Sequence, residues 1–153
     1  MQKHICHLAL VILMACSAGA FAGELLVNGG FENGKTGWSQ WGSDAYVVSD
    51  TGYFYDSASA VLYWVGSGLV QKVAADPCQS FTLSGEMIYP SSQPLSGRKA
   101  YLKIEFWNGS GSGATQLGYV EVGVMSPEDS PDQWHSFSGT VPKGKVCHVP
   151  DKL

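Results

Sequence analysis

The chain carries little charge, and its charge is weighted to the acidic side. Charged residues make up 14% of the 153 residues, and the formal net charge is -4. Nucleic acids and anionic membrane surfaces favour proteins with clustered Lys and Arg, and the sequence has no basic patch, so we expect neither as a partner. Hydrophobic residues make up 44% of the chain, which is too many for a disordered protein. The length allows one core, so we expect one domain.

Catalytic signatures are also missing. The sequence contains no G-x-S-x-G elbow, no H-E-x-x-H pair and no phosphate-binding glycine loop. A glycosidase needs two carboxylates at a defined separation. Glu86, Glu105 and Glu121 fall in expected strands, but no spacing pairs two of them as acid and base. The sequence therefore predicts that the protein is not an enzyme.

The apolar run near the N-terminus, Leu8–Cys16, is too short to span a bilayer, which takes about 20 residues. It follows Lys3 and precedes the small-x-small sequence Ala20–Ala22, and these are the three parts of a secretory signal. We expect a signal peptide over residues 1–22, cleaved after Ala22, and a domain over residues 23–153. The mature protein would be secreted, periplasmic or at the cell surface. As an alternative, Leu13–Cys16 is similar to a bacterial lipoprotein cleavage site that would leave Cys16 lipidated.

Cysteine is scarce in the expected mature chain. Of the four cysteines, Cys6 and Cys16 belong to the expected signal peptide, which leaves Cys78 and Cys147. In an oxidising compartment these two could form a disulfide, and the alternative is a pair of buried free thiols.

Turn residues recur along the mature chain, and no stretch shows sustained helical periodicity, which predicts an all-β fold. The clearest strand is Ala100–Trp107, in which apolar residues alternate with Tyr101, Lys103, Glu105 and Trp107, so that one face is core and the other is solvated. Eight strands are expected, at Leu25–Val27, Ala45–Ser49, Ala60–Val65, Leu69–Val73, Phe81–Tyr89, Ala100–Trp107, Leu117–Val124 and Trp134–Val141.

The opening of the mature chain joins an apolar stretch to a glycine turn and two aromatic anchors. Its residues are Asn28-Gly29-Gly30-Phe31-Glu32, followed by Gly37-Trp38. This order resembles the start of the carbohydrate-binding modules of families four, nine and twenty-two, which accompany cellulases and xylanases. Phe81–Gly85 and Trp134–Pro142 are similar to later strands of the same family, so the resemblance covers most of Glu24–Pro142.

The resemblance implies a jelly-roll β-sandwich of the galactose-binding-domain type. Family members continue past the proline that corresponds to Pro142 with further strands, so the last strand is expected to be missing here. The resemblance also implies a structural calcium ion, held by the Glu32 carboxylate, by the carbonyls of Asn28 and Gly29 and by a C-terminal aspartate for which this chain offers only Asp151, because Ca²⁺ prefers hard oxygen ligands. The alternative is that Glu32 only accepts hydrogen bonds from backbone amides of the turn.

Sugars present polar edges and apolar C–H faces, so they are bound by aromatic platforms beside hydrogen-bonding side chains. In the family a concave sheet carries these residues. We expect Tyr101, Trp107 and Glu105 to bind the ligand there, with surface packing across strands as the alternative. Tyr63 and Trp64 must point to opposite faces, so only one of them can contribute. The remaining candidates lie near the sandwich edge: Trp41, Tyr53 and Tyr55.

Together these features predict a secreted, non-catalytic module that binds a polysaccharide such as a β-glucan or xylan. Two alternatives remain open at this point. The first is a structural or adhesive surface domain that contacts protein through the same scaffold. The second is a fragment of a larger glycoside hydrolase. The sequence does not indicate the oligomeric state.

Overall fold

The computed structural model describes residues 9–11, 24–42, 45–48, 59–62, 66–74, 79–109 and 112–142. Tyr53, Tyr55, Trp64, Cys78 and Cys147 lie outside these residues. The described residues form nine strands and no helix, which confirms the all-β prediction. The strands are β1 (Ala9–Val11), β2 (Ser39–Trp41), β3 (Ala45–Val48), β4 (Ser59–Leu62), β5 (Gly68–Val70), β6 (Phe81–Ile88), β7 (Ala100–Trp107), β8 (Gln116–Met125) and β9 (His135–Val141).

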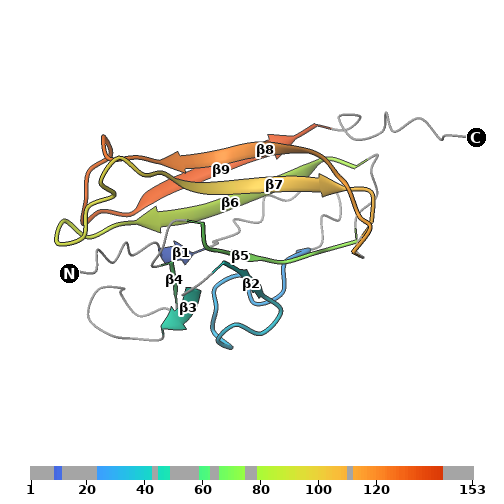
Figure 1. Cartoon of the computed structure of the whole chain (residues 1–153), viewed down its shortest axis with the longest axis horizontal. Helices are drawn as coiled ribbons and strands as arrows, with labels where there is room; N and C mark the ends of the chain where they lie inside the picture. Colours follow the sequence, from blue (N-terminus) through green and yellow to red (C-terminus); the bar gives the residue numbers. More distant parts are fainter. Residues whose placement is uncertain are drawn as a thin grey trace, which may run out of the picture.

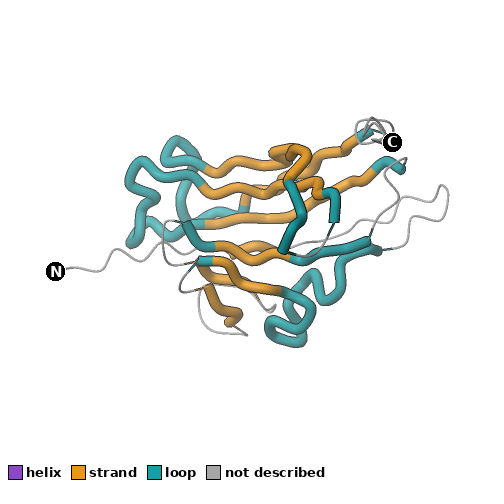
Figure 2. The backbone as a smooth tube through the Cα atoms, turned by 45° about the vertical axis from the view of Figure 1, so that its right-hand side comes forward, coloured by secondary structure: helices purple, strands orange, loops and turns teal. Residues whose placement is uncertain are grey.

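The strands form three antiparallel sheets. One has five strands in the order β3-β4-β1-β6-β9, and the others are the pairs β2-β5 and β7-β8. The long strands β6 to β9 run side by side along the molecule, with the shorter strands at one side of them (Figure 1). Loops and turns link the strands at both ends (Figure 2). This arrangement is consistent with a β-sandwich.

No described segment forms a helix long and apolar enough to cross a lipid bilayer.

Seven of the eight expected strands are present, β7 with the expected ends and the others with ends that differ by a few residues, and the exception is Leu25–Val27. This segment bends from Leu26 onward, and the backbone of Val27 pairs with a side chain instead of a strand. The Gln71 Nε2 group donates to the Val27 carbonyl over 2.8 Å, and the Val27 N–H donates to Gln71 Oε1 over 2.6 Å. A side-chain amide therefore takes the place of a neighbouring strand's peptide group.

Two strands were not expected. β2 has only three residues, all of them exposed, so it lacks the alternation by which a strand is recognised. β1 lies within the residues expected to form the signal peptide, and it pairs with both β4 and β6 in the five-stranded sheet.

The main core lies between the β7-β8 pair and the five-stranded sheet. Its buried members come from β6, β7, β8 and the loop after β6, and are Met87, Tyr89, Leu95, Leu102 and Met125. A smaller core forms around the turn before β2, where Phe31 and Ala60 are buried and Trp38 and Leu69 pack against them. The alternation in β7 therefore does place its apolar residues inward, as the sequence predicts.

Two loops at one end of the long strands are fastened to each other. The Tyr89 hydroxyl donates to the Asp129 carbonyl, and the Asp132 N–H donates to the Tyr89 carbonyl over 2.9 Å. The Ser91 N–H in turn donates to Asp132 Oδ1 over 2.9 Å. Burial, followed by the nearby Asp129 carboxylate, raises the pKa of the Tyr89 hydroxyl. These contacts make the Asp132 carboxylate a fastening point between the loops.

This fastening predicts a pH-dependent contribution to stability. Hydrogen bonds from the Ser91 side chain and then from its backbone N–H lower the pKa of Asp132. A carboxyl group whose pKa is lower in the folded state stabilises the fold above its unfolded pKa of about 4, and this stabilisation is lost as pH falls through the folded value. We expect the melting temperature of the parent chain to fall more steeply between pH 5 and pH 3 than that of Asp132→Asn.

Asparagine is a suitable replacement because Asp132 has a φ of 59°, a backbone conformation that Asn tolerates. Thermal melts of both chains across this pH range measure the effect, and the other carboxyl groups cancel in the comparison. Parallel pH profiles would show that Asp132 does not contribute in this way.

Candidate functional site

The solvated face of the β7-β8 pair combines aromatic and charged side chains. On β7, Tyr101, Lys103, Glu105 and Trp107 follow one another at every second position, which places them on one face. The sheet register sets Tyr119 of β8 opposite Glu105, on this same face. The other β7 residues of this face also have partners on β8: Lys103 lies opposite Glu121, Tyr101 opposite Val124, and Trp107 opposite Gln116. We call this surface the β7-β8 outer face.

Two irregularities in β8 shape this face. The register skips Val122 between Gly123 and Glu121, and it skips Leu117 between Gly118 and Gln116. A bulge of this kind shifts the phase of the strand by one residue. The second one leaves Leu117 exposed beside Gln116, although a regular strand would turn one of the two inward.

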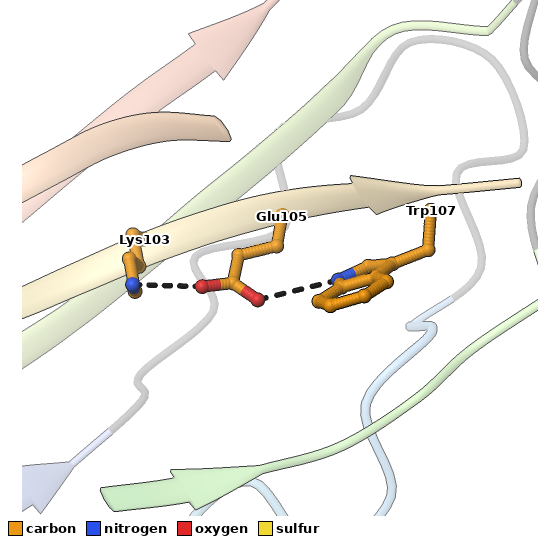
Figure 3. A network of polar contacts seen from close by, with 3 residues as sticks. All are labelled: Lys103, Glu105 and Trp107. Atoms are coloured by element: carbon orange, nitrogen blue, oxygen red, sulfur yellow. Dashed lines mark hydrogen bonds and ion pairs between the residues drawn. The ribbon is translucent and has the colours of Figure 1, made fainter. Parts of the chain in front are cut away.

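Three side chains of β7 form a connected polar row. The Lys103 Nζ atom lies 2.7 Å from Glu105 Oε1, and the Trp107 Nε1–H group donates to Glu105 Oε2 over 3.2 Å. Figure 3 shows all three side chains leaving β7 on one side, with the Glu105 carboxylate between the other two. The Lys103 Nζ atom also lies 5.7 Å from the centre of the Tyr119 ring, within reach of a cation-π interaction.

This row orients the Trp107 ring on the face. Because Glu105 Oε2 accepts from the indole N–H, the Trp107 ring is oriented along the strand, with 47% of the residue exposed. Tyr101 is 47% exposed and Tyr119 is 57% exposed. Tyr101 and Trp107 are six positions apart on an extended strand, which separates them by about 20 Å. Aromatic groups thus lie at both ends and near the middle of the face.

The structure therefore brings together the three expected ligand residues Tyr101, Glu105 and Trp107, and adds Tyr119 and Glu121. Sequence reasoning missed these two. Alternation in Leu117–Val124 places Tyr119 and Glu121 on one face, but only the pairing of β8 with β7 shows that this face is shared with Glu105.

Trp41 belongs to a different sheet. It ends β2, is 50% exposed, and lies opposite Gly68 of β5. A Cβ atom on Gly68 would come within 2.3 Å of the Trp41 Nε1 atom, so the glycine leaves room for the indole ring. Trp41 is thus a separate exposed aromatic on the β2-β5 pair. The other expected ligand residues, Tyr53, Tyr55 and Trp64, and the disulfide candidates Cys78 and Cys147, fall outside the described residues.

The expected calcium ligands lie in the turn after Val27. Asn28 organises this turn: its side-chain Nδ2 group donates to the carbonyls of Gly34 and Thr36, and its Oδ1 atom accepts the Asn33 N–H over 2.9 Å. The Asn28 carbonyl accepts from the Trp38 Nε1–H and from the Phe31 N–H. Both Asn28 oxygens thus face N–H donors, whose positive ends oppose a cation.

Asn28 therefore does not fit a calcium ligand in this conformation. The exposed Glu32 carboxylate folds back over Gly30, and within the described ranges no cluster of three or more His, Cys, Asp or Glu could hold a metal ion. Calcium binding stays a prediction that depends on Glu32. In this conformation Asn28 connects the backbone groups of the turn directly.

The β7-β8 outer face has the chemistry of a stacking surface with hydrogen-bonding groups between its rings. An aromatic ring with one face in solvent can cover an apolar C–H face, and the carboxylates of Glu105 and Glu121 can accept hydroxyl hydrogen bonds. Comparisons with protein-family models, with curated proteins and with solved structures found no match.

Proposed function

We propose that this chain is a non-catalytic carbohydrate-binding protein that binds a polysaccharide along the β7-β8 outer face. The observation that carries the proposal is the spacing of three half-exposed rings, Tyr101, Tyr119 and Trp107, around Lys103 and Glu105. Such a surface offers stacking at several points and polar groups between them, which matches a linear chain of sugar rings better than a single small molecule.

Three further points belong to the proposal, and each follows from an expectation based on the sequence. The sheets belong to a jelly-roll sandwich of the galactose-binding-domain type. The chain acts outside the cytoplasm after cleavage near Ala22. Its ligands are polysaccharides such as β-glucan or xylan, because the resemblance of the mature sequence is to modules that accompany cellulases and xylanases.

Binding can be tested by affinity gel electrophoresis of the chain in gels that contain soluble β-glucan, xylan or other glycans. We expect retardation in at least one glycan gel and none in a gel without glycan. Circular dichroism of the same sample establishes that the protein is folded. A folded protein that migrates freely in every gel would contradict the proposal.

The Trp107→Ala variant tests the site itself. Large aromatic anchors of a binding surface commonly cost about 2 kcal/mol or more when truncated, so we expect affinity for the retarding glycan to fall by about 30-fold or more. Tyr119→Ala should act in the same direction because its ring lies between those of Tyr101 and Trp107. Val27→Ala is a suitable control, since Val27 is 62% exposed and lies in the turn segment before β2.

Trp41→Ala separates two versions of the site. Unchanged affinity in this variant would confine binding to the β7-β8 outer face, whereas a loss would extend the site to the β2-β5 pair. Full affinity in both Trp107→Ala and Tyr119→Ala would overturn the assignment of the site.

A second candidate function is a surface domain that contacts protein. The observation that favours it is Leu117, which is 44% exposed on β8 near Tyr119 and Trp107. Apolar side chains that gather on an exposed face mark protein interfaces as well as ligand sites. If free oligosaccharide abolishes the retardation in a glycan gel, the face binds carbohydrate, and the first proposal is supported over the second.

A further inference from the structure

A strand from the expected signal peptide occupies an interior position in the largest sheet. β1 lies between β4 and β6 in the order β3-β4-β1-β6-β9, and Figure 1 shows it beside β4. It is antiparallel to both neighbours, with Leu10 in register with Ala60 on one side and Met87 on the other. The sheet is therefore continuous only while residues 9–11 are in place.

The strands on either side of β1 contain some of the most buried residues in the described part of the chain. Ala60 and Val61 of β4 are 1% exposed, and Met87 of β6 is fully buried. Removing a strand from such a position would leave backbone N–H and C=O groups of both neighbours without partners in an apolar region, which is costly. Any segment that replaces β1 must be extended, so that its backbone can pair with both β4 and β6.

We propose that the position between β4 and β6 is a strand-binding site whose occupant is the leader of this chain, and that the leader stays bound there as a separate strand after cleavage. This is β-strand addition, in which main-chain hydrogen bonds supply the affinity. The site is distinct from the β7-β8 outer face and does not depend on carbohydrate binding.

The bound leader is held along a short stretch. β1 is in register with Glu86, Met87 and Ile88 of β6, whereas β9 is in register with β6 from Phe81 to Met87. A contact of three residues gives few ladder hydrogen bonds. After cleavage, the leader strand should therefore exchange with an added peptide of the same sequence. β9 pairs with seven residues of β6 and should stay in place.

The test uses the full chain with a specific protease site inserted between Ala22 and Gly23. After cleavage of the folded protein, we expect the leader fragment to co-elute with residues 23–153 in size-exclusion chromatography. A fluorescent, solubly tagged peptide of residues 5–15 should then replace it in a concentration-dependent manner. Immediate separation of the leader, with an unchanged melting temperature for the remainder, would overturn the proposal.

Leu10→Pro gives an independent reading in the uncleaved chain. Proline has no N–H and disrupts a ladder in the interior of a sheet. We expect the peptides that cover Glu86–Ile88 to exchange their amide hydrogens at least about fivefold faster in this variant. Met14→Pro is the matched control, since it places the same residue in the leader outside β1. Equal exchange in Leu10→Pro and the parent would overturn the proposal even if cleavage makes the protein aggregate.

Discussion

Replacing Phe31 with alanine is expected to lower the free energy of unfolding by about 3–5 kcal/mol, the usual cost of removing a buried phenylalanine ring. Phe31 is fully buried. Its ring lies 5.0 Å from that of Trp38, and Ala60 and Leu69 complete the cluster. The ring joins the glycine-rich turn to β4 and β5, so its loss leaves a cavity where three segments meet.

The unusual backbone conformation of Phe31 does not contribute to the difference in unfolding free energy between parent and variant. Its φ is 61°, which is unfavourable for any residue with a Cβ atom, and alanine keeps that cost unchanged. The difference between parent and variant therefore reports the side chain. Chemical denaturation followed by tryptophan fluorescence measures it, and for a chain of this size we expect the melting temperature to fall by about 10 °C.

Val27→Ala is the control for Phe31→Ala. Val27 is 62% exposed, and its contacts with Gln71 use backbone atoms that alanine retains. Exposed substitutions of this kind usually change stability by less than about 0.5 kcal/mol. Similar losses in the two variants would mean that the turn is not part of the core.

The local alternation of the sequence predicts β7 to the residue, because an eight-residue strand with one solvated face carries its own periodicity. It cannot predict which residues of β8 share that face. The two bulges at Val122 and Leu117 each shift the phase by one residue, so the period-two pattern fails along β8. Tyr119 and Glu121 are placed in the site only by pairing with β7.

Contacts between distant segments explain the other differences. Leu25–Val27 has the composition of a strand, but the backbone of Val27 is hydrogen-bonded to the side chain of Gln71, which lies 44 positions away in the sequence. The apolar residues of β1 fit a signal peptide, and nothing local to them indicates a place between β4 and β6. Phe31, in contrast, is predicted as a core anchor because the residues before it form a turn that directs the chain inward.

The packing of β8 on β9 gives the second large expected effect. Gly123→Ala should destabilise the protein by about 3 kcal/mol, the upper part of the range for overpacking a core. A Cβ atom at Gly123 would lie 2.3 Å from Phe137 Cγ and 2.6 Å from Phe137 Cβ. Because the Phe137 Cβ atom is itself too close, rotating the ring cannot relieve the overlap, and the two strands must move apart.

Gly118→Ala is the matched control, since it adds the same methyl group to the same strand where no atom lies within 4 Å of the new Cβ. We expect its free energy of unfolding to stay within about 0.5 kcal/mol of the parent. Because β8 also carries Tyr119 and Glu121, separation of β8 from β9 should disturb the β7-β8 outer face, so Gly123→Ala should lose glycan binding at a lower temperature than Gly118→Ala. Equal stability of the two alanine variants would show that β8 and β9 are not in the close contact described.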